Sequence, residues 1–148
     1  MIDTRVSVIV PTLDTRELTL SCVESVLGSR LQDGVALEVV VVDDGSTDGT
    51  TESLASRHPR VHVLRNVATE GFARAVNRGV AEAAGDVLVL LNSDAEVEPL
   101  SLACVLEALA ADGRLGVVGA TLSYPDGTAQ WSAGPAPGRP KVGDWWIR

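Results

Sequence analysis

Polar side chains follow four apolar runs of the sequence, at the points where the runs end. The residues among them that we expect to bind a ligand are Pro11, Thr12, Asp43, Asp44, Asn92, Ser93 and Asp94. A carboxylate beside a nucleobase can accept a ring N–H, whereas one that faces a diphosphate needs a divalent cation between them. These residue types favour a nucleotide diphosphate bound with Mg2+ or Mn2+. We expect Asp94 to bind the metal and Asp43 to bind the nucleobase.

The elements that must position these side chains are short strands alternating with helices. Five continuous apolar runs are the expected strands: Val6–Val10, Leu37–Val42, Val61–Leu64, Val87–Leu91 and Leu115–Val118. Runs of this kind are typical of strands that are buried on both faces, as in a parallel sheet covered by helices. We predict an α/β fold with an open, mostly parallel Rossmann-like sheet, helices on both faces, and strand order 3-2-1-4 plus a further strand.

Helical periodicity separates the strands. Apolar residues at helical spacing predict helices over 18–27, over 72–84 and after Pro99, and a shorter helix is expected near Asp48 with Ser46 or Thr47 as its cap. The expected buried faces are formed by Leu18, Cys22, Val23, Val26 and Leu27 in the first helix and by Phe72, Val76, Val80, Ala83 and Ala84 in the second. We expect both Cys22 and Cys104 to pack in the core, and Arg74 and Arg78 to lie on a solvated face. The segment Tyr124–Thr128 has turn chemistry and predicts a hairpin tip or an excursion from the sheet. We expect one domain over residues 1–133, followed by a Pro/Gly-rich loop and an apolar, Trp-containing end over 134–148.

In an open parallel sheet, ligands bind at the carboxyl ends of the strands. With strand order 3-2-1-4, Asp43 and Asp94 flank the first strand at a separation of about 10 Å, which is close to the reach of a nucleoside diphosphate. Sequences such as Asp-Gly and Asn-Ser-Asp are also ordinary turns, and a single one would more often cap a helix than bind a ligand. Three carboxylate-rich loops at one edge favour a functional site.

Composition and charge exclude several classes of partner. The 148 residues include 20 acidic and 12 basic side chains, for a net charge of -8. Such a charge repels nucleic acid and anionic membrane surfaces, so neither is an expected partner. We see neither a membrane span nor a secretory signal, which makes the cytoplasm the expected location.

Longer stretches of the sequence resemble the family 2 nucleotide-sugar glycosyltransferases, which have the GT-A fold. The matching segments are VSVIVPT (6–12), VVVDDGSTDGT (40–50), GFARAVNRGVAEAAGDVLVLLNSDAEVEP (71–99) and YPDGTAQ (124–130). The likeness is strongest to the rhamnosyltransferase-like branch, in which NSD replaces the more usual DxD. It covers the N-terminal, donor-binding part of such proteins.

The resemblance implies roles for individual residues. Pro11 and Thr12 correspond to contacts with the nucleoside, Asp43 to the nucleobase ligand and Asp44 to its partner in the same loop. Asp94 corresponds to the ligand of Mg2+ or Mn2+, and Asn92 and Ser93 correspond to the rest of the metal-binding motif. Asn77 corresponds to the asparagine of the helix that precedes the strand before this motif.

The implied activity is the inverting transfer of a sugar from a nucleotide diphosphate donor to an acceptor hydroxyl. The acceptor is a saccharide, a lipid-linked saccharide or a small molecule, and no residue of this sequence matches the family's catalytic base. The acceptor-binding region of the family is expected to be missing, so a donor-binding module that needs a partner is an alternative. A nucleotidyltransferase is a weaker alternative, and P-loop or dinucleotide-binding motifs are absent.

Overall fold

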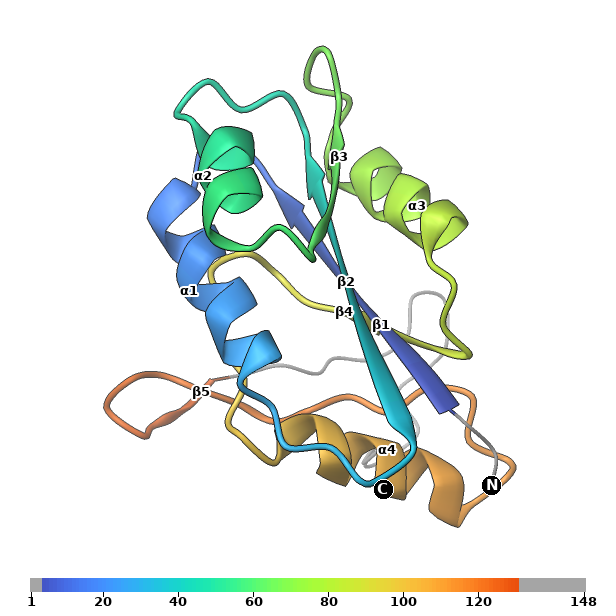
Figure 1. Cartoon of the computed structure of the whole chain (residues 1–148). Coiled ribbons are helices and arrows are strands. Elements are labelled where there is room, and N and C mark those ends of the chain that lie inside the picture. The colour runs from blue at the N-terminus through green and yellow to red at the C-terminus, as the bar shows by residue number, and fades with distance from the viewer. Residues whose placement is uncertain (1–3, 131–148) are drawn as a thin grey trace, which may run out of the picture. The chain divides into compact units, whose positions relative to one another are not determined.

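A parallel sheet lies at the centre of the first of two units in this chain (Figure 1). The structure is a computed structural model that describes residues 4–130. The units are Met1–Leu100 and Ser101–Arg148. The expected Pro/Gly-rich loop and apolar end over 134–148, together with the boundary at 133, lie outside the described residues.

The sheet of the first unit has the expected strand order. Its four strands run in the order β3-β2-β1-β4, and each neighbouring pair is parallel. Thr12 pairs with Asp43 across β1 and β2, and Ile9 pairs with Leu90 across β1 and β4. The bounds of the strands are β1 Thr4–Thr12, β2 Val35–Asp43, β3 His62–Arg65 and β4 Val87–Leu90. The carboxyl ends of β1, β2 and β4 therefore share one edge, as the sequence predicts.

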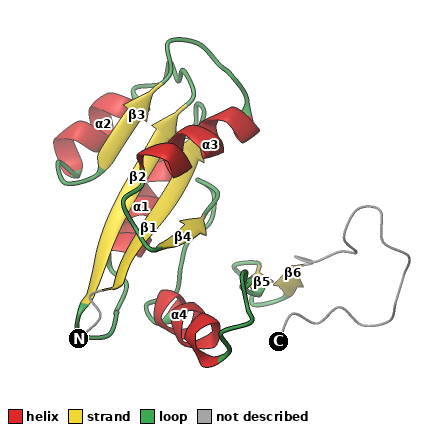
Figure 2. Cartoon of the chain, turned by 90° about the vertical axis from the view of Figure 1, so that its right-hand side faces the viewer, coloured by secondary structure: helices red, strands yellow, loops and turns green. Residues whose placement is uncertain are grey.

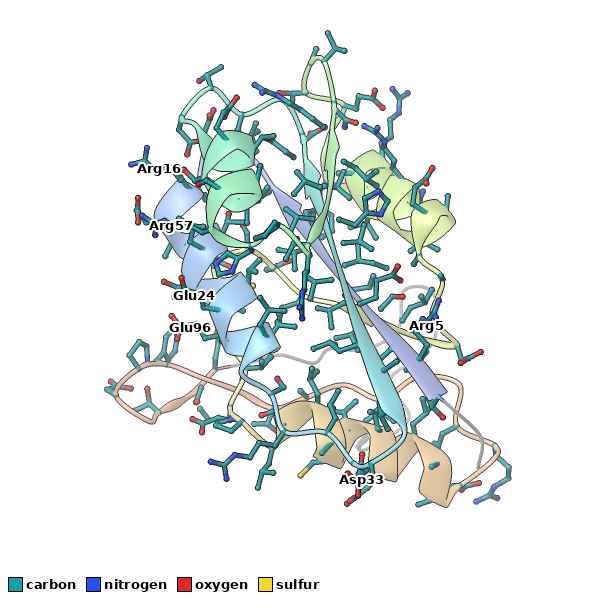
Figure 3. All side chains as sticks on the ribbon, viewed as in Figure 1. Arg5, Arg16, Glu24, Asp33, Arg57 and Glu96 are labelled. Atoms are coloured by element: carbon teal, nitrogen blue, oxygen red, sulfur yellow. The ribbon has the colours of Figure 1, made fainter. Side chains whose placement is uncertain are left out.

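Three helices cover the two faces of this sheet (Figure 1, Figure 2). Helices α1 (Arg16–Leu27) and α2 (Thr50–Arg57) lie on one face, and α3 (Phe72–Glu82) lies across the other. Among the charged side chains labelled in Figure 3, those of Arg16, Glu24 and Arg57 lie on the outer side of α1 and α2, away from the sheet. Most of β1 and the carboxyl-terminal half of β2 are therefore buried on both faces, which is why they form continuous apolar runs, whereas Leu88 and Leu90 of β4 are exposed.

The core forms where α3 packs on the sheet. Ile9, Val40, Val42 and Ala75 are fully buried in one cluster. Gly79 lies over the same cluster, and a Cβ at that position would come within 2.5 Å of the Ile9 Cγ2 atom. The close approach of the helix to the sheet therefore requires glycine here.

The buried faces of α1 and α3 differ from those predicted. In α3, Ala75, Val76 and Gly79 are buried, whereas Phe72 and Val80 are exposed. Small residues allow the helix backbone to approach the strands, so the packed face is the one with the smallest side chains. In α1, Leu18 and Leu27 are exposed, although the pattern placed them on the buried face.

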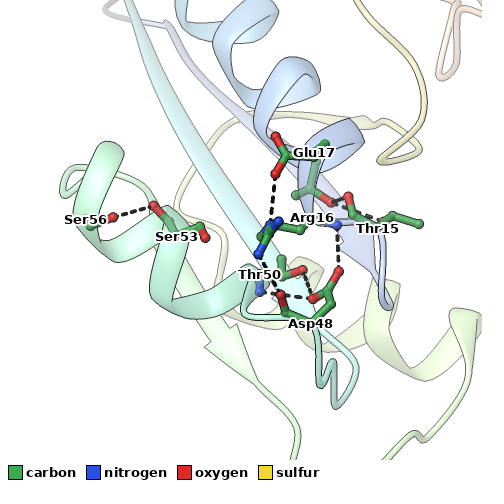
Figure 4. Close-up of polar contacts among 8 residues, drawn as sticks. Thr15, Arg16, Glu17, Asp48, Thr50, Ser53 and Ser56 are labelled. Atoms are coloured by element: carbon green, nitrogen blue, oxygen red, sulfur yellow. Dashed lines mark hydrogen bonds and ion pairs between the residues drawn. The ribbon is translucent and has the colours of Figure 1, made fainter.

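A single carboxylate joins the N-termini of α1 and α2 (Figure 4). The Asp48 side chain accepts the Arg16 N–H at 2.8 Å and the Thr50 N–H at 3.0 Å. The expected short helix is thus present, but it begins at Thr50 with Gly49 as its N-cap residue, and the side chain that accepts a hydrogen bond at its start belongs to Asp48 rather than to Ser46 or Thr47. This contact fixes the start of α1, which lies beside the site described below.

The second unit contains a helix and a hairpin. They are α4 (Ser101–Ala111) and the antiparallel pair β5 (Leu122–Ser123) and β6 (Ala129–Gln130). The turn between the strands is closed by the Gly127 N–H, which donates to Tyr124 O at 2.8 Å, so the predicted hairpin is confirmed. The strand expected over 115–118 is not formed, because Gly116 interrupts a run of only three apolar side chains. No helix in residues 4–130 is long and apolar enough to cross a membrane.

Candidate functional site

A cleft of about 370 Å³ opens at the carboxyl ends of the strands in the first unit. It is formed by the segments that follow β1, β2 and β4 and by the start of α3. Six of the predicted site residues line it: Pro11, Thr12, Asp44, Asn92, Ser93 and Asp94. The sheet topology thus brings together residues that lie up to 83 positions apart in the sequence.

Asp44 lies on the wall of the cleft next to β2, where its carboxylate holds the loop before α3. Oδ1 accepts hydrogen bonds from Asn66 Nδ2 at 2.6 Å and from the Glu70 N–H at 2.9 Å. Oδ2 accepts one from the Gly71 N–H at 2.8 Å. Burial alone would raise the pKa of Asp44, but these hydrogen bonds outweigh it and leave the pKa below its ordinary value. The group is therefore an anion at neutral pH.

Asp43 lies behind the cleft instead of in it. Its side chain is fully buried, Oδ1 accepts the Ser46 N–H at 2.7 Å, and Oδ2 accepts the Thr51 hydroxyl. Both oxygens thus accept hydrogen bonds from within the protein, one from the loop after β2 and one from the start of α2. Successive residues of an extended chain point to opposite sides, so only one member of the Asp43–Asp44 pair can face a ligand.

The loop after β2 also touches the loop before α3 through Gly45. This residue has φ +93°, and a Cβ would lie 3.1 Å from the backbone of Ala68. Arg78 of α3, which we expected on the solvated face, donates to Asn66 Oδ1 and to Arg65 O. These contacts make the β2 side of the cleft a densely hydrogen-bonded wall.

Asp94 lies on the opposite wall, after β4, with its carboxylate free. The side chain is exposed and forms no hydrogen bond or ion pair with any residue of 4–130. No group of three or more His, Cys, Asp or Glu side chains that could hold a metal occurs in that range. The donor set fits a cation such as Mg2+, which commonly takes one or two protein carboxylates and fills its remaining positions with phosphate oxygens and water.

Helix α1 holds the turn that carries Asp94. The Cys22 thiol donates to Asn92 O at 3.5 Å, and Ser25 Oγ accepts the Val97 N–H at 3.0 Å. Burial raises the pKa of the Cys22 thiol to about 12, with smaller contributions from Glu96 and Asp94. The thiol therefore keeps its proton at neutral pH and remains a donor. We expected both cysteines to be core residues; Cys22 is buried, but Cys104 of α4 is exposed.

A cluster of hydroxyl groups joins the end of β1 to the same turn. Thr12 Oγ1 lies 2.9 Å from Thr15 Oγ1 and 2.7 Å from Thr19 Oγ1, and Thr15 Oγ1 lies 3.1 Å from Ser93 Oγ. Sequence reasoning missed Thr15 and Thr19. The signal that could have revealed them is the spacing of Thr15, Thr19 and Cys22, which places small polar side chains on one face of a helix.

Asn77 is the one predicted site residue on α3, and it does not line the cleft. Its side chain is exposed and forms no hydrogen bond among the described residues. The α3 residues that do reach the cleft are Phe72 and Ala75, next to Gly71. The apolar side chains of Leu13, Leu18 and Phe72 give the cleft surfaces on which a flat ring could pack.

Sequence comparisons agree with this arrangement. The model of Glycosyl transferase family 2 matches residues 7–146. A dolichol-phosphate mannosyltransferase of Pyrococcus furiosus is 41% identical over 108 residues, which make up 71% of this chain and 30% of that protein. An N-acetylglucosaminyl-diphospho-decaprenol L-rhamnosyltransferase of Mycobacterium tuberculosis is 34% identical over 112 residues, or 68% of this chain and 36% of that protein.

A solved structure is similar as well. The mannosyltransferase PcManGT from Pyrobaculum calidifontis, in complex with GDP-Man and Mn2+, matches with a TM-score of 0.64 and 32% identity over 72% of this chain and 32% of that one. This chain spans about a third or less of the length of the curated relatives it matches. The comparisons confirm the predicted family and the GT-A fold. The chain belongs to glycosyl transferase family 2.

Proposed function

We propose that this chain provides the donor site of a glycosyltransferase that moves a sugar from a nucleotide diphosphate to an acceptor hydroxyl. One observation carries the proposal: a single cleft gathers Thr12, Asp44 and Asp94 from three parallel strand ends. The cleft offers apolar surfaces for a ring, an anionic acceptor on one wall and a free carboxylate on the other. A nucleotide diphosphate bound with a cation needs all three.

In this proposal Asp44, rather than Asp43, accepts the nucleobase N–H. Asp44 lines the cleft, and its Oδ2 accepts a single hydrogen bond among residues 4–130, so it can accept another. The lowered pKa of Asp44 keeps this acceptor ionised. Asp43 is fully buried and does not line the cleft, so its part is to shape the loop. Contacts of Pro11, Thr12 and Asn77 with the donor remain predictions.

Asp94 is the residue that would hold Mg2+ or Mn2+, together with oxygens of the diphosphate. Asn92 replaces a second carboxylate in the motif, so the protein alone supplies a single anionic ligand. A bound cation would neutralise charge that develops on the departing diphosphate. The solved PcManGT complex contains Mn2+, which supports a metal in this proposal.

The proposed reaction is a displacement with inversion at the anomeric carbon. A base removes the proton from the acceptor hydroxyl, the acceptor oxygen forms the new bond to the anomeric carbon, and the bond to the diphosphate breaks. The cleft residues position the leaving group in this scheme. The catalytic base and the acceptor are not assigned to any residue of this chain, and a cytoplasmic location and the lack of nucleic-acid binding stay predictions.

Calorimetric titration with UDP, dTDP and GDP, with and without Mn2+, tests the proposal. We expect one of these nucleotides to bind the wild-type protein more tightly with Mn2+ and expect Asp94→Ala to lose that gain. Glu96→Gln is a matched control, because Glu96 is an exposed acid in the same segment that does not line the cleft. Equal, metal-independent binding by all three proteins would remove the role given to Asp94.

A donor-binding module that depends on a partner is the second candidate. The two acids that line the cleft, Asp44 and Asp94, are assigned to the nucleobase and the cation, so neither is assigned to activate an acceptor, which favours this candidate. The measurement is release of free sugar, or transfer to added acceptors, by the isolated chain supplied with the nucleotide sugar it binds. Turnover by the isolated chain would argue against this candidate, whereas tight donor binding without turnover would support it.

A further inference from the structure

Asp14 lies in the loop after β1 and has a backbone conformation that is unusual for its residue type. Its φ of +50° is the only positive φ of a residue other than glycine among residues 4–130. A side chain with a Cβ atom crowds the backbone in this left-handed region, and aspartate and asparagine reach it most readily because their side chains can hydrogen-bond to nearby groups. Such a conformation persists only where the surrounding structure holds it.

The loop after β2 holds Asp14 in this conformation. The Asp14 N–H donates to Ser46 Oγ at 2.9 Å, and Asp14 Oδ1 accepts the Thr47 N–H at 2.7 Å and the Thr47 hydroxyl at 3.3 Å. Ser46 is buried, and its own N–H donates to Asp43 Oδ1 at 2.7 Å. Asp14 therefore connects the loop after β1 to the loop whose shape Asp43 maintains.

These two loops carry the groups that we assign to the nucleobase. Leu13 and Thr15, on either side of Asp14, line the cleft, whereas Asp14 itself does not. Leu13 offers an apolar surface to the face of a ring, and Asp44 in the other loop offers a carboxylate oxygen to the edge of the same ring. The ring gains both contacts only if Leu13 and Asp44 are correctly spaced, and Asp14 connects the loops that carry them.

We propose that Asp14 is a positioning residue for nucleobase binding, which holds Leu13 at the correct spacing from Asp44. Asp14 does not contact the ligand in this scheme, because its Oδ1 atom binds Thr47 and the residue does not line the cleft. Its contribution is preorganisation, since a loop that is already held in place loses less freedom when the ring binds. The inference rests on the proposed function, because it assumes that a nucleotide occupies the cleft.

Three substitutions of Asp14 separate its conformation from its hydrogen bonds. Asp14→Ala loses the carboxylate acceptor and disfavours the positive φ, Asp14→Gly loses only the acceptor, and Asp14→Asn keeps both an acceptor oxygen and the tolerance of positive φ. The measurement is calorimetric titration with UDP, dTDP and GDP in the presence of Mn2+. For the nucleotide that the wild-type protein binds most tightly, we expect Asp14→Ala to weaken binding roughly 3- to 10-fold, because the loop conformation that binds is populated less often. Asp14→Asn should restore wild-type affinity, and Asp14→Gly should lie between the two.

A double variant with Leu13→Ala shows whether Asp14 acts through Leu13. Leu13→Ala removes the apolar surface and should weaken binding by itself, and adding Asp14→Ala should then cause little further loss. A general loss of structure would instead weaken binding by the same factor in both backgrounds. Thr47→Ala is a matched control, because it removes the Thr47 hydroxyl but keeps the N–H that donates to Asp14, and it should bind as the wild type does.

Wild-type affinity in both Asp14→Ala and Asp14→Gly would overturn the inference, as would an equal loss from Asp14→Ala with and without Leu13. Asp14→Gly decides the question should Asp14→Ala fold poorly, because glycine adopts a φ of +50° without strain. If Asp14→Gly binds as tightly as Asp14→Asn, the role given to the carboxylate is wrong. Each of these results leaves the donor-site proposal intact. Failure of the wild-type protein to bind any of the three nucleotides would refute the donor-site proposal itself, and this inference with it.

Discussion

The two walls of the cleft use their carboxylates in opposite ways. On the β2 side, Asp43 and Asp44 are buried and accept five hydrogen bonds between them from the surrounding loops. On the β4 side, Asp94 is exposed and has no partner within residues 4–130. The carboxylates of the β2 side bind groups of the protein itself and hold the loops in place. The carboxylate of the β4 side is available to bind a ligand.

In the sequence the acids of this site look alike, but in the structure those of the β2 side maintain the shape of the cleft and Asp94 on the β4 side is available to bind a ligand. The turn after β4 is held by neutral groups: Thr15, the N-cap residue of α1, and Cys22 and Ser25 within that helix. The free carboxylate of Asp94 is therefore positioned without being neutralised. Substitutions on the two walls should separate accordingly, with stability lost on the β2 side and ligand binding lost on the β4 side.

The largest expected effect on folding is that of Asp44→Ala. The substitution leaves Asn66 and the N–H groups of Glu70 and Gly71 without their acceptor, so we expect a loss of about 2–4 kcal/mol in the free energy of unfolding. Asp94→Ala is the matched variant on the other wall and should stay within about 0.5 kcal/mol of wild type. Urea denaturation measures both, and similar losses for the two variants would contradict the comparison.

The close approach of the two loops on the β2 wall gives the next largest effect. Gly45→Ala adds a methyl group 3.1 Å from the Ala68 backbone at φ +93°, so strain and crowding should cost roughly 2–3 kcal/mol. Gly49→Ala is the control, since Gly49 also has a positive φ of +84° but meets only the Arg16 guanidinium, at 3.8 Å. It should cost about 1 kcal/mol. Equal unfolding midpoints for the two variants would show that the loops can separate without cost.

On the β4 wall, Ser25→Ala tests how α1 holds the turn. The Val97 N–H loses its acceptor, for an expected cost of about 1 kcal/mol and a weaker gain in nucleotide affinity with Mn2+. Ser29→Ala, one turn further along the chain, removes only a long 3.4 Å contact with Ser25 O and is the control. Should both variants match wild type in stability and in Mn2+-dependent binding, α1 does not order the turn.

The smallest effect is the pH dependence of stability that Asp44 contributes on the β2 wall. The pKa of Asp44 is lowered in the folded protein, so its contribution to stability is complete above the unfolded pKa of about 3.9 and is lost as pH falls through the lower folded value. Between pH 5 and pH 3, wild type should lose more stability than Asp44→Asn. Thermal unfolding across this range measures the difference, and parallel curves would mean that Asp44 is not held as an anion.

The fold could be predicted from the sequence because its signals are long and redundant. The runs that became β1 and β2 are almost wholly β-branched or apolar, and such strands have few alternatives to the interior of a parallel sheet. The strand expected over 115–118 had a weaker signal, interrupted by Gly116, and did not form. The predicted buried face of α3 was wrong at Phe72 and Val80. The helix packs closely on the sheet through Ala75 and Gly79, which hydrophobic periodicity does not favour.

For the candidate site, the sequence predicts which loops form it but not which side chains of those loops face the cleft. Sequence position identifies the segment that follows a strand, but the direction of each side chain depends on where the strand ends, so the Asp43–Asp44 pair could not be resolved in advance. The hydroxyl groups of Thr15 and Thr19 join the site only when α1 packs beside the turn after β4. The spacing of Thr15, Thr19 and Cys22 indicates a shared helix face, but not that this face contacts the turn after β4.

The most direct test of the free carboxylate is electron paramagnetic resonance of Mn2+, in which bound ions lose the sharp signal of free Mn2+. With one protein carboxylate available, wild type should bind Mn2+ weakly alone and at least tenfold more tightly once the preferred nucleoside diphosphate is added. Asp94→Asn should lose most of that gain, and Glu96→Gln should keep it. Tight Mn2+ binding without nucleotide, or an unchanged gain in Asp94→Asn, would contradict the account.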